Sequence, residues 1–172
     1  MNKVLIAYHS NTKNTEKVAN TIKEVLEEQK QDVTIKPAKE VDPSEIKSYD
    51  LFILGSGIYG GGIGKSAKDL VANATEFPSK FALFSTHMQP ERNPKIFGNT
   101  KKKIQDCGAT LVGETDCVGD ALGISEEFRQ KMMEPMPAEG KEQTKKWFEA
   151  IKGRPNEKDL EKIKEFAKSL VK

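Results

Sequence analysis

Short apolar runs alternate along the chain with stretches in which apolar residues recur every three or four positions. Residues 4–8 are almost continuously apolar, as in a strand that is buried on both faces of a parallel sheet. After a polar segment the spacing becomes helical, with apolar side chains at Val18, Ile22, Val25 and Leu26. This order predicts a strand, a loop and then an amphipathic helix that begins near Thr15.

The same alternation continues to the end of the chain. Further strands are predicted over residues 32–35, 49–54, 80–85 and 109–118, and further helices around residues 67–74, 96–107 and 157–170. Asn156 is a suitable N-cap for the last helix. Strands that alternate with helices form a parallel sheet with right-handed crossovers. We therefore expect an α/β fold, with a doubly wound five-stranded sheet, helices on both faces and a single domain over residues 1–172.

Residues 125–153 do not follow this alternation. The segment contains a methionine-rich stretch and then the aromatic pair Trp147-Phe148. We expect a helical insertion within the domain, ahead of the last helix. It could pack its aromatic pair against the body of the domain, or it could offer its methionines to a partner.

Composition and charge exclude several classes of protein. The chain has 172 residues, with 28 Lys and Arg against 26 Asp and Glu, a net charge of +2, so no nucleic-acid partner is expected. The apolar runs are far shorter than the roughly 20 residues of a membrane span, and we expect a cytoplasmic protein. Cys107 and Cys117 form no metal-binding pattern with each other or with His9 or His87, which predicts reduced thiols and no metal.

A polar loop follows the first strand and leads directly into a helix. Its residues are Ser10, Asn11, Thr12, Lys13, Asn14 and Thr15. Hydroxyls, amides and the unpaired N–H groups of the helix N-terminus together can hold a phosphate. The alternative is ordinary helix capping, but a cap needs only one such residue.

A glycine-rich segment follows the third strand, over residues 55–66. A Walker A loop needs a glycine where the chain has Tyr59, and the dinucleotide-binding pattern lacks the acidic residue expected at the end of the next strand. Both nucleotide motifs are therefore excluded. The segment still offers a backbone that a flat ligand can approach closely, with Tyr59 available to stack on that ligand or to fold onto the surface.

The loop after the fourth strand reaches the same edge of the sheet. It contains Ser85, Thr86, His87, Met88 and Gln89. These groups suit the polar edge of a heteroaromatic ring, although a plain connecting loop with an exposed histidine explains them equally well. His87 is the candidate titrating group because it can change charge near neutral pH.

These residues resemble the flavodoxin family. The phosphate-loop pattern Ser/Thr-x-Thr-Gly-x-Thr is matched by residues 10–15, except that Lys13 replaces glycine, and residues 55–60 end in an aromatic residue and a glycine as the family's flavin loop does. The resemblance covers residues 1–120 and the last helix. It implies a flavodoxin-like fold, in which the five strands have the order 2-1-3-4-5, and it implies FMN as the cofactor.

The resemblance also implies a role for each loop. The loop of residues 10–15 would hold the FMN phosphate, and the loop of residues 85–89 would line the pyrimidine edge of the flavin. Gly60 would supply a carbonyl that turns towards the flavin N5–H. The residues expected around the isoalloxazine ring are Ser56, Gly57, Ile58, Tyr59, Gly60 and Gly61.

Two functions remain open. The first is an electron-transfer protein that exchanges electrons with redox partner proteins or a reductase. The second is an FMN-dependent NAD(P)H:quinone or protoporphyrinogen-type oxidoreductase, in which His87 would donate a proton. The second is favoured by the absence of the second flavin-covering aromatic residue that is typical of classical flavodoxins. The sequence leaves the oligomeric state open.

Overall fold

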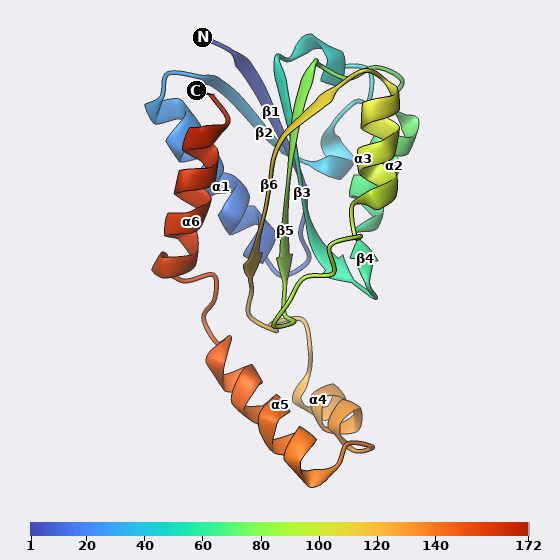
Figure 1. The fold of residues 1–172 in the computed structure, drawn as a ribbon, viewed down its shortest axis with the longest axis vertical. Coiled ribbons are helices and arrows are strands. Elements are labelled where there is room, and N and C mark those ends of the chain that lie inside the picture. The colour runs from blue at the N-terminus through green and yellow to red at the C-terminus, as the bar shows by residue number, and fades with distance from the viewer. Residues whose placement is uncertain (172) are drawn as a thin grey trace.

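A central five-stranded parallel sheet organises the computed structural model, which describes residues 1–171 (Figure 1). Its strands are β1 (Lys3–His9), β2 (Asp32–Pro37), β3 (Leu51–Tyr59), β5 (Lys80–His87) and β6 (Thr110–Val118). Their order in the sheet is β2-β1-β3-β5-β6, and all four pairings are parallel. The predicted order of the five main strands is thereby confirmed.

Helices cover both faces of the sheet (Figure 1). The helices α1 (Asn14–Glu28) and α6 (Glu157–Ser169) lie on one face, and α2 (Lys65–Asn73) and α3 (Gly98–Asp106) lie on the other. Successive residues of β3 alternate between the two apolar layers, with Phe52 and Leu54 under α2 and α3 and Ile53 under α1 and α6. This alternation explains why the central strands read as continuous apolar runs.

The last helix begins where the sequence predicts. The Asn156 side chain accepts a hydrogen bond from the Asp159 N–H (3.2 Å), and the Asp159 carboxylate accepts one from the Asn156 N–H (3.0 Å). This reciprocal arrangement is a capping box, which satisfies two backbone donors at the helix start. Two short 3₁₀ helices, Ala38–Glu40 and Ile46–Ser48, complete the connection from β2 to β3.

The predicted end of the third strand is wrong. The strand continues from Leu54 through the glycines to Tyr59 and pairs antiparallel with β4 (Gly62–Ile63). Gly60 and Gly61 have φ of 56° and 81°, the left-handed values that a tight hairpin turn requires at both central positions. Gly55 pairs with both neighbouring strands, and this position requires glycine because a Cβ there would come within 1.9 Å of the Phe84 ring.

Two helices lie in the predicted insertion, α4 (Glu126–Met133) and α5 (Ala138–Ala150). We call residues 125–153 the helical arm, which extends beyond the carboxyl end of the sheet (Figure 1). Phe148 is buried in a small apolar cluster at the base of the arm, and Trp147 packs against that cluster. The expectation that this aromatic pair packs against the body is confirmed. Within residues 1–171, no helix has the length and apolar character needed to cross a membrane.

Candidate functional site

A cavity of about 620 Å³ opens at the carboxyl ends of the strands. Its volume lies within the usual range of small-molecule sites. Twelve of the residues that the sequence nominates contribute to its lining: Asn11, Thr12, Asn14, Gly57, Ile58, Tyr59, Gly60, Gly61, Thr86, His87, Met88 and Gln89. The loop after β1, the β3–β4 hairpin and the segment at the end of β5 therefore meet at one place, as expected for ligand sites of doubly wound sheets.

The loop after β1 contains an unsatisfied donor and a strained backbone. The Ser10 hydroxyl is buried and has no hydrogen-bond partner within residues 1–171. Lys13, at the N-cap of α1, has φ of 67° and makes no side-chain capping bond. That left-handed conformation is the one that the glycine of the family pattern adopts at little cost. Lys13 is exposed and lies outside the cavity lining.

The loop after β6 packs tightly against this first loop. The Asn14 side-chain amide donates a hydrogen bond to the Asp120 carbonyl (2.8 Å). A Cβ on Gly119 would come within 2.6 Å of Asn14, and a Cβ on Gly123 would come within 3.0 Å of Thr12. The close approach requires a glycine at position 119 and leaves little room for a side chain at position 123, and residues of both loops line the cavity.

Tyr59, the last residue of β3, contacts the loop that follows β1. Its hydroxyl oxygen accepts a hydrogen bond from the Asn11 backbone N–H (3.0 Å), and a Cβ on Gly57 would come within 2.5 Å of that hydroxyl. Burial raises the pKa of Tyr59, against the opposing effect of the Asn11 hydrogen bond. The His9 and Tyr59 rings pack edge to face, with 5.3 Å between ring centroids and 73° between ring planes. Burial lowers the pKa of His9, whose Nδ1 lies 2.6 Å from the Ser66 hydroxyl.

Four of the nominated hydroxyl residues are outside the cavity lining: Ser10, Thr15, Ser56 and Ser85. The Ser56 hydroxyl donates to the Gly57 carbonyl (2.7 Å) and accepts from the Gly64 N–H (2.8 Å), so it holds the hairpin. The Thr15 and Thr86 hydroxyls are 2.8 Å apart and join the first turn of α1 to the end of β5. The Ser85 hydroxyl is buried without a partner within the described residues.

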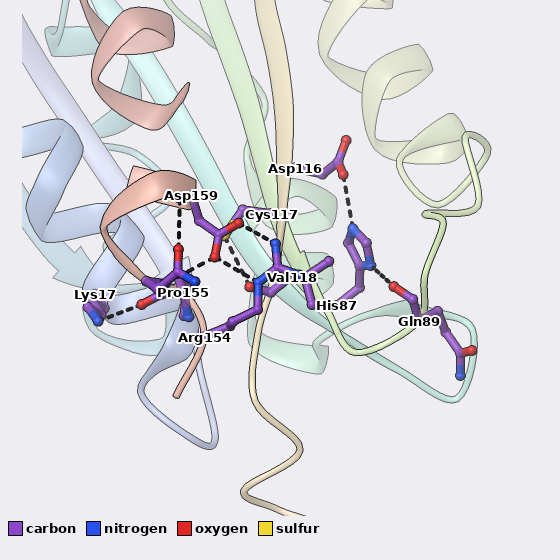
Figure 2. Close-up of polar contacts among 10 residues, drawn as sticks. Lys17, His87, Gln89, Asp116, Cys117, Val118, Arg154, Pro155 and Asp159 are labelled. Atoms are coloured by element: carbon purple, nitrogen blue, oxygen red, sulfur yellow. Dashed lines mark hydrogen bonds and ion pairs between the residues drawn. The ribbon is translucent and has the colours of Figure 1, made fainter. Parts of the chain in front are cut away.

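His87 is buried and both of its ring nitrogens have partners (Figure 2). Nδ1 lies 2.8 Å from the Gln89 carbonyl oxygen, and Nε2 lies 2.9 Å from the Asp116 carboxylate. Both partners are acceptors, so the ring donates to both only when both nitrogens carry hydrogen. This arrangement anchors the loop after β5 and does not support the expectation that His87 passes a proton to a substrate.

A cluster of charged side chains extends from Asp116 across β6. Arg92 pairs with Glu114 (2.5 Å) and with Asp116 (3.4 Å), and Lys101 of α3 pairs with the other oxygen of Glu114. The side chains of Arg92 and Glu114 are 16% and 14% exposed, so solvent screens this pair less than an ordinary surface ion pair. The cluster fixes the segment that follows His87 and brings Arg92 to the rim of the cavity.

Sequence reasoning missed part of the lining. The additional residues are Glu91, Arg92, Asn93, Gly119, Asp120, Ala121, Gly123 and Ile124. Those after β6 could have been found by the rule that identified the other loops, since this strand neighbours β5 and ends at the same edge. Arg92 gave no such signal, because its position depends on ion pairs with a strand that follows it in the chain.

The base of the helical arm is bonded to the same region. The Asp120 N–H donates to the Arg154 carbonyl (2.7 Å), and the Asp120 carboxylate accepts from the Gly153 N–H (2.8 Å). The Arg154 guanidinium in turn binds the Asp159 carboxylate of α6 (Figure 2). Burial opposes the ionisation of Asp159, but the hydrogen bonds from Arg154 and from the Asn156 backbone lower its pKa overall.

Cys117 lies beside this pair and is not a reactive thiol (Figure 2). Burial, with the negative charge of Asp159 adding to it, raises its pKa to about 12. The sulfhydryl donates to the Val118 carbonyl (3.4 Å). Within residues 1–171, no group of three or more His, Cys, Asp or Glu side chains is arranged to hold a metal ion.

The residues of the cavity fit FMN. The Ser10 hydroxyl is unpartnered, and it lies in the loop before the N-terminus of α1, which offers backbone donors of the kind that bind phosphate. The glycine hairpin and the loop after β5 both line the cavity, and they offer a closely approachable backbone and polar groups of the kind that a flat heteroaromatic ring needs. The chemistry of these residues therefore suits a ligand that carries both a phosphate and a flat ring.

Comparison with known proteins identifies flavodoxins as relatives of this chain. Residues 5–168 match the flavodoxin domain family. An uncharacterized protein of Methanocaldococcus jannaschii is 33% identical over 172 residues, which cover 99% of each chain. The fold is similar to that of oxidised Flavodoxin 2 from Bacillus cereus, with a TM-score of 0.67 at 24% identity, over 98% of this chain and 97% of that one.

A further likeness is to a larger protein. Rubredoxin oxygen:oxidoreductase from Desulfovibrio gigas aligns with a TM-score of 0.63 at 17% identity, over 98% of this chain and 35% of that chain. These structural likenesses show the fold, whereas the domain match and the archaeal relative show the family. The chain belongs to the flavodoxin family, and FMN is the cofactor that this membership implies.

Proposed function

We propose that the protein carries electrons between redox partner proteins through an FMN held in the cavity at the carboxyl ends of β1, β3, β5 and β6. The bound flavin supplies one- and two-electron redox chemistry, and the protein supplies binding, orientation and control of access. The observation that carries the proposal is the convergence of a hydroxyl-rich loop, a glycine hairpin with Tyr59 and a polar loop on one cavity of about 620 Å³.

The first loop binds the phosphate in this proposal. Ser10 and Thr12 donate their hydroxyls, and the backbone N–H groups at the start of α1 add further donors. The Asn11 N–H is bonded to the Tyr59 hydroxyl, so phosphate binding at Asn11 requires that hydroxyl to move. Asn14 and Thr15 hold the loop in place through Asp120 and Thr86.

The other loops bind the ring. Tyr59 lies against one side of the isoalloxazine, and the hairpin around Gly60 and Gly61 gives its backbone carbonyls access to the flavin N5 edge. The loop of Thr86, Met88 and Gln89 borders the pyrimidine edge. No protein nucleophile is required for this function, which agrees with the inert environment of Cys117.

The phosphate assignment is tested with Ser10→Ala and Thr12→Ala, each titrated with FMN and with riboflavin. A hydrogen bond to a charged group contributes about 1.5–3 kcal/mol, so each variant should bind FMN about 10- to 100-fold more weakly. Riboflavin has no phosphate and should bind within about 2-fold of wild type. Ser169→Ala, an exposed serine bonded only within its own helix, is the matched control. Equal losses for FMN and riboflavin would refute the assignment.

One observation favours an enzyme as the second candidate. Tyr59 is the only Phe, Tyr or Trp side chain among the described residues that line the cavity, so a substrate could reach the flavin face left uncovered. We would then expect NADPH alone to reduce the bound flavin within seconds under anaerobic conditions. For the electron-transfer protein, reduction requires a separate reductase, and a stopped-flow absorbance trace distinguishes the two functions.

A further inference from the structure

The three carbonyl groups that begin the loop after β5 are all bonded within the protein. The His87 carbonyl accepts from the Gly119 N–H (2.9 Å), the Met88 carbonyl from the Trp147 indole N–H (2.6 Å), and the Gln89 carbonyl from His87 Nδ1 (2.8 Å). Each donor comes from a different segment. The direction of these carbonyls is therefore fixed by the fold and not by a ligand.

The N–H groups of the same loop are left free. No hydrogen bond joins the backbone N–H of Met88 or Gln89 to another group within residues 1–171. Both residues line the cavity. The loop therefore offers backbone donors, but no free carbonyl acceptor from His87 to Gln89, to whatever occupies the cavity.

In a planar trans peptide the C=O of one residue and the N–H of the next residue point in opposite directions. The hydrogen bond that each carbonyl makes therefore shows where the following N–H points. The His87 carbonyl points to the loop after β6, so the Met88 N–H points to the opposite side of β5, where β3 and its hairpin lie. The Met88 carbonyl points to Trp147 on the helical arm, so the Gln89 N–H points away from the arm. Trp147 thereby sets the orientation of the Met88–Gln89 peptide, although it does not itself line the cavity.

We infer that Trp147 is a positioning residue for the flavin, which turns the Gln89 N–H towards the acceptor atoms of the pyrimidine edge. The inference rests on the proposed function, because it requires a flavin in the cavity. It also gives the helical arm a role. The His87 and Gln89 carbonyls are bonded by Gly119 and by the His87 ring, and α5 supplies the indole donor for the remaining carbonyl, that of Met88. Negative charge that collects at the pyrimidine edge on reduction strengthens a hydrogen bond from such an N–H.

The experiment compares Trp147→Phe with Met132→Leu. Both substitutions alter the apolar cluster at the base of the arm, but only the first removes the hydrogen-bond donor. Dissociation constants are measured for oxidised FMN, oxidised riboflavin and dithionite-reduced FMN. A neutral hydrogen bond contributes about 0.5–1.5 kcal/mol, so Trp147→Phe should weaken both oxidised ligands by the same factor, about 3-fold. A charge-assisted bond is about twice as strong, so reduced FMN should bind about 10-fold more weakly.

Several outcomes would overturn the inference. Equal losses for oxidised and reduced FMN would show that Trp147 has only a structural role, as would a Trp147→Phe variant that behaves like Met132→Leu. A loss confined to FMN would place the effect at the phosphate. If wild type binds no flavin, the proposed function fails and the inference fails with it, whereas normal wild-type binding with an unchanged Trp147→Phe refutes the inference alone.

A measurement on wild type covers the case in which Trp147→Phe does not fold. Trp147 is the only tryptophan of the chain, so a ¹H–¹⁵N spectrum contains one indole signal. That N–H should exchange with solvent more slowly than the indole of a free tryptophan, and its signal should shift when either FMN or riboflavin binds. An indole N–H that exchanges freely, or a signal that neither ligand moves, would overturn the inference.

Discussion

Lys13 occupies a backbone conformation that suits glycine, at the N-cap of α1 and beside the proposed phosphate site. Its φ of 67° is disfavoured for a residue with a Cβ, and its positive charge lies at the positive end of the helix dipole. Neither feature helps the helix. A lysine here becomes favourable when a phosphate dianion binds, so Lys13→Gly should have opposite effects on the free protein and on the complex.

The size of the effect on the free protein follows from the backbone. A left-handed non-glycine residue costs about 1–2 kcal/mol, and the greater freedom of glycine in the unfolded chain offsets about 0.4–1 kcal/mol of the gain. Lys13→Gly should therefore stabilise the apoprotein by roughly 1 kcal/mol. For a domain of this size that corresponds to a rise in Tm of about 2–4 °C, measured by calorimetry.

The effect on the complex has the other sign. An exposed ion pair contributes about 0.2–1 kcal/mol, so Lys13→Gly should weaken FMN binding by up to about 5-fold at low salt. Salt screens exposed charges, and the difference between variant and wild type should vanish near 1 M salt. Riboflavin binding should be unchanged at every salt concentration.

Lys30 provides a matched control. It is also an exposed lysine with a left-handed backbone, with φ of 60°, but it lies beyond the other end of α1. Lys30→Gly removes the same charge and the same backbone strain far from the cavity, so it should stabilise the apoprotein and leave FMN binding unchanged. The reasoning is refuted if Lys13→Gly fails to stabilise the apoprotein, or if Lys30→Gly weakens FMN to the same extent.

Three further predictions concern the hairpin, the base of the arm and the thiols. Gly60→Ala places a Cβ in open space but at φ of 56°, so it should destabilise the fold by about 1 kcal/mol and lower the yield of one-electron-reduced flavin in a redox titration; an unchanged yield would mean that the Gly60 carbonyl does not serve N5. Asp159→Asn should lower the unfolding free energy by about 2–3 kcal/mol at pH 7, because it breaks the bond to Arg154. The folded-state pKa of Asp159 is lowered, so its contribution is present above the unfolded pKa near 4 and is lost as the pH falls through the folded pKa; a difference between variant and wild type that does not shrink as the pH falls below 4 would contradict this origin. With a thiol reagent at pH 8, the native protein should show one reactive cysteine, the exposed Cys107, and Cys117 should react only after unfolding.

The order of the strands and the position of the three nominated loops could be predicted because both depend on local patterns. Residues 4–8 and 80–85 lie within the strands that the apolar runs predict. The rule that ligands bind at the carboxyl ends of parallel strands then brings Asn11, Tyr59 and Met88 to one cavity. The hairpin at Gly60 was missed because glycine indicates a loop more often than a strand, and only the packing of Phe84 reveals why Gly55 belongs to the strand.

The role of Asp120 could not be predicted, because its three backbone and side-chain bonds join segments that are distant in the sequence. Its carbonyl accepts from Asn14 across 106 positions, and its carboxylate accepts from Gly153 across 33 positions. Its N–H donates to the carbonyl of Arg154, in the segment between α5 and α6. The N-terminus of α1, the base of the helical arm and the segment that leads into α6 are therefore all bonded to one residue. Since Trp147 of the same arm holds the loop after β5, both ends of the proposed flavin site depend on how the arm is attached.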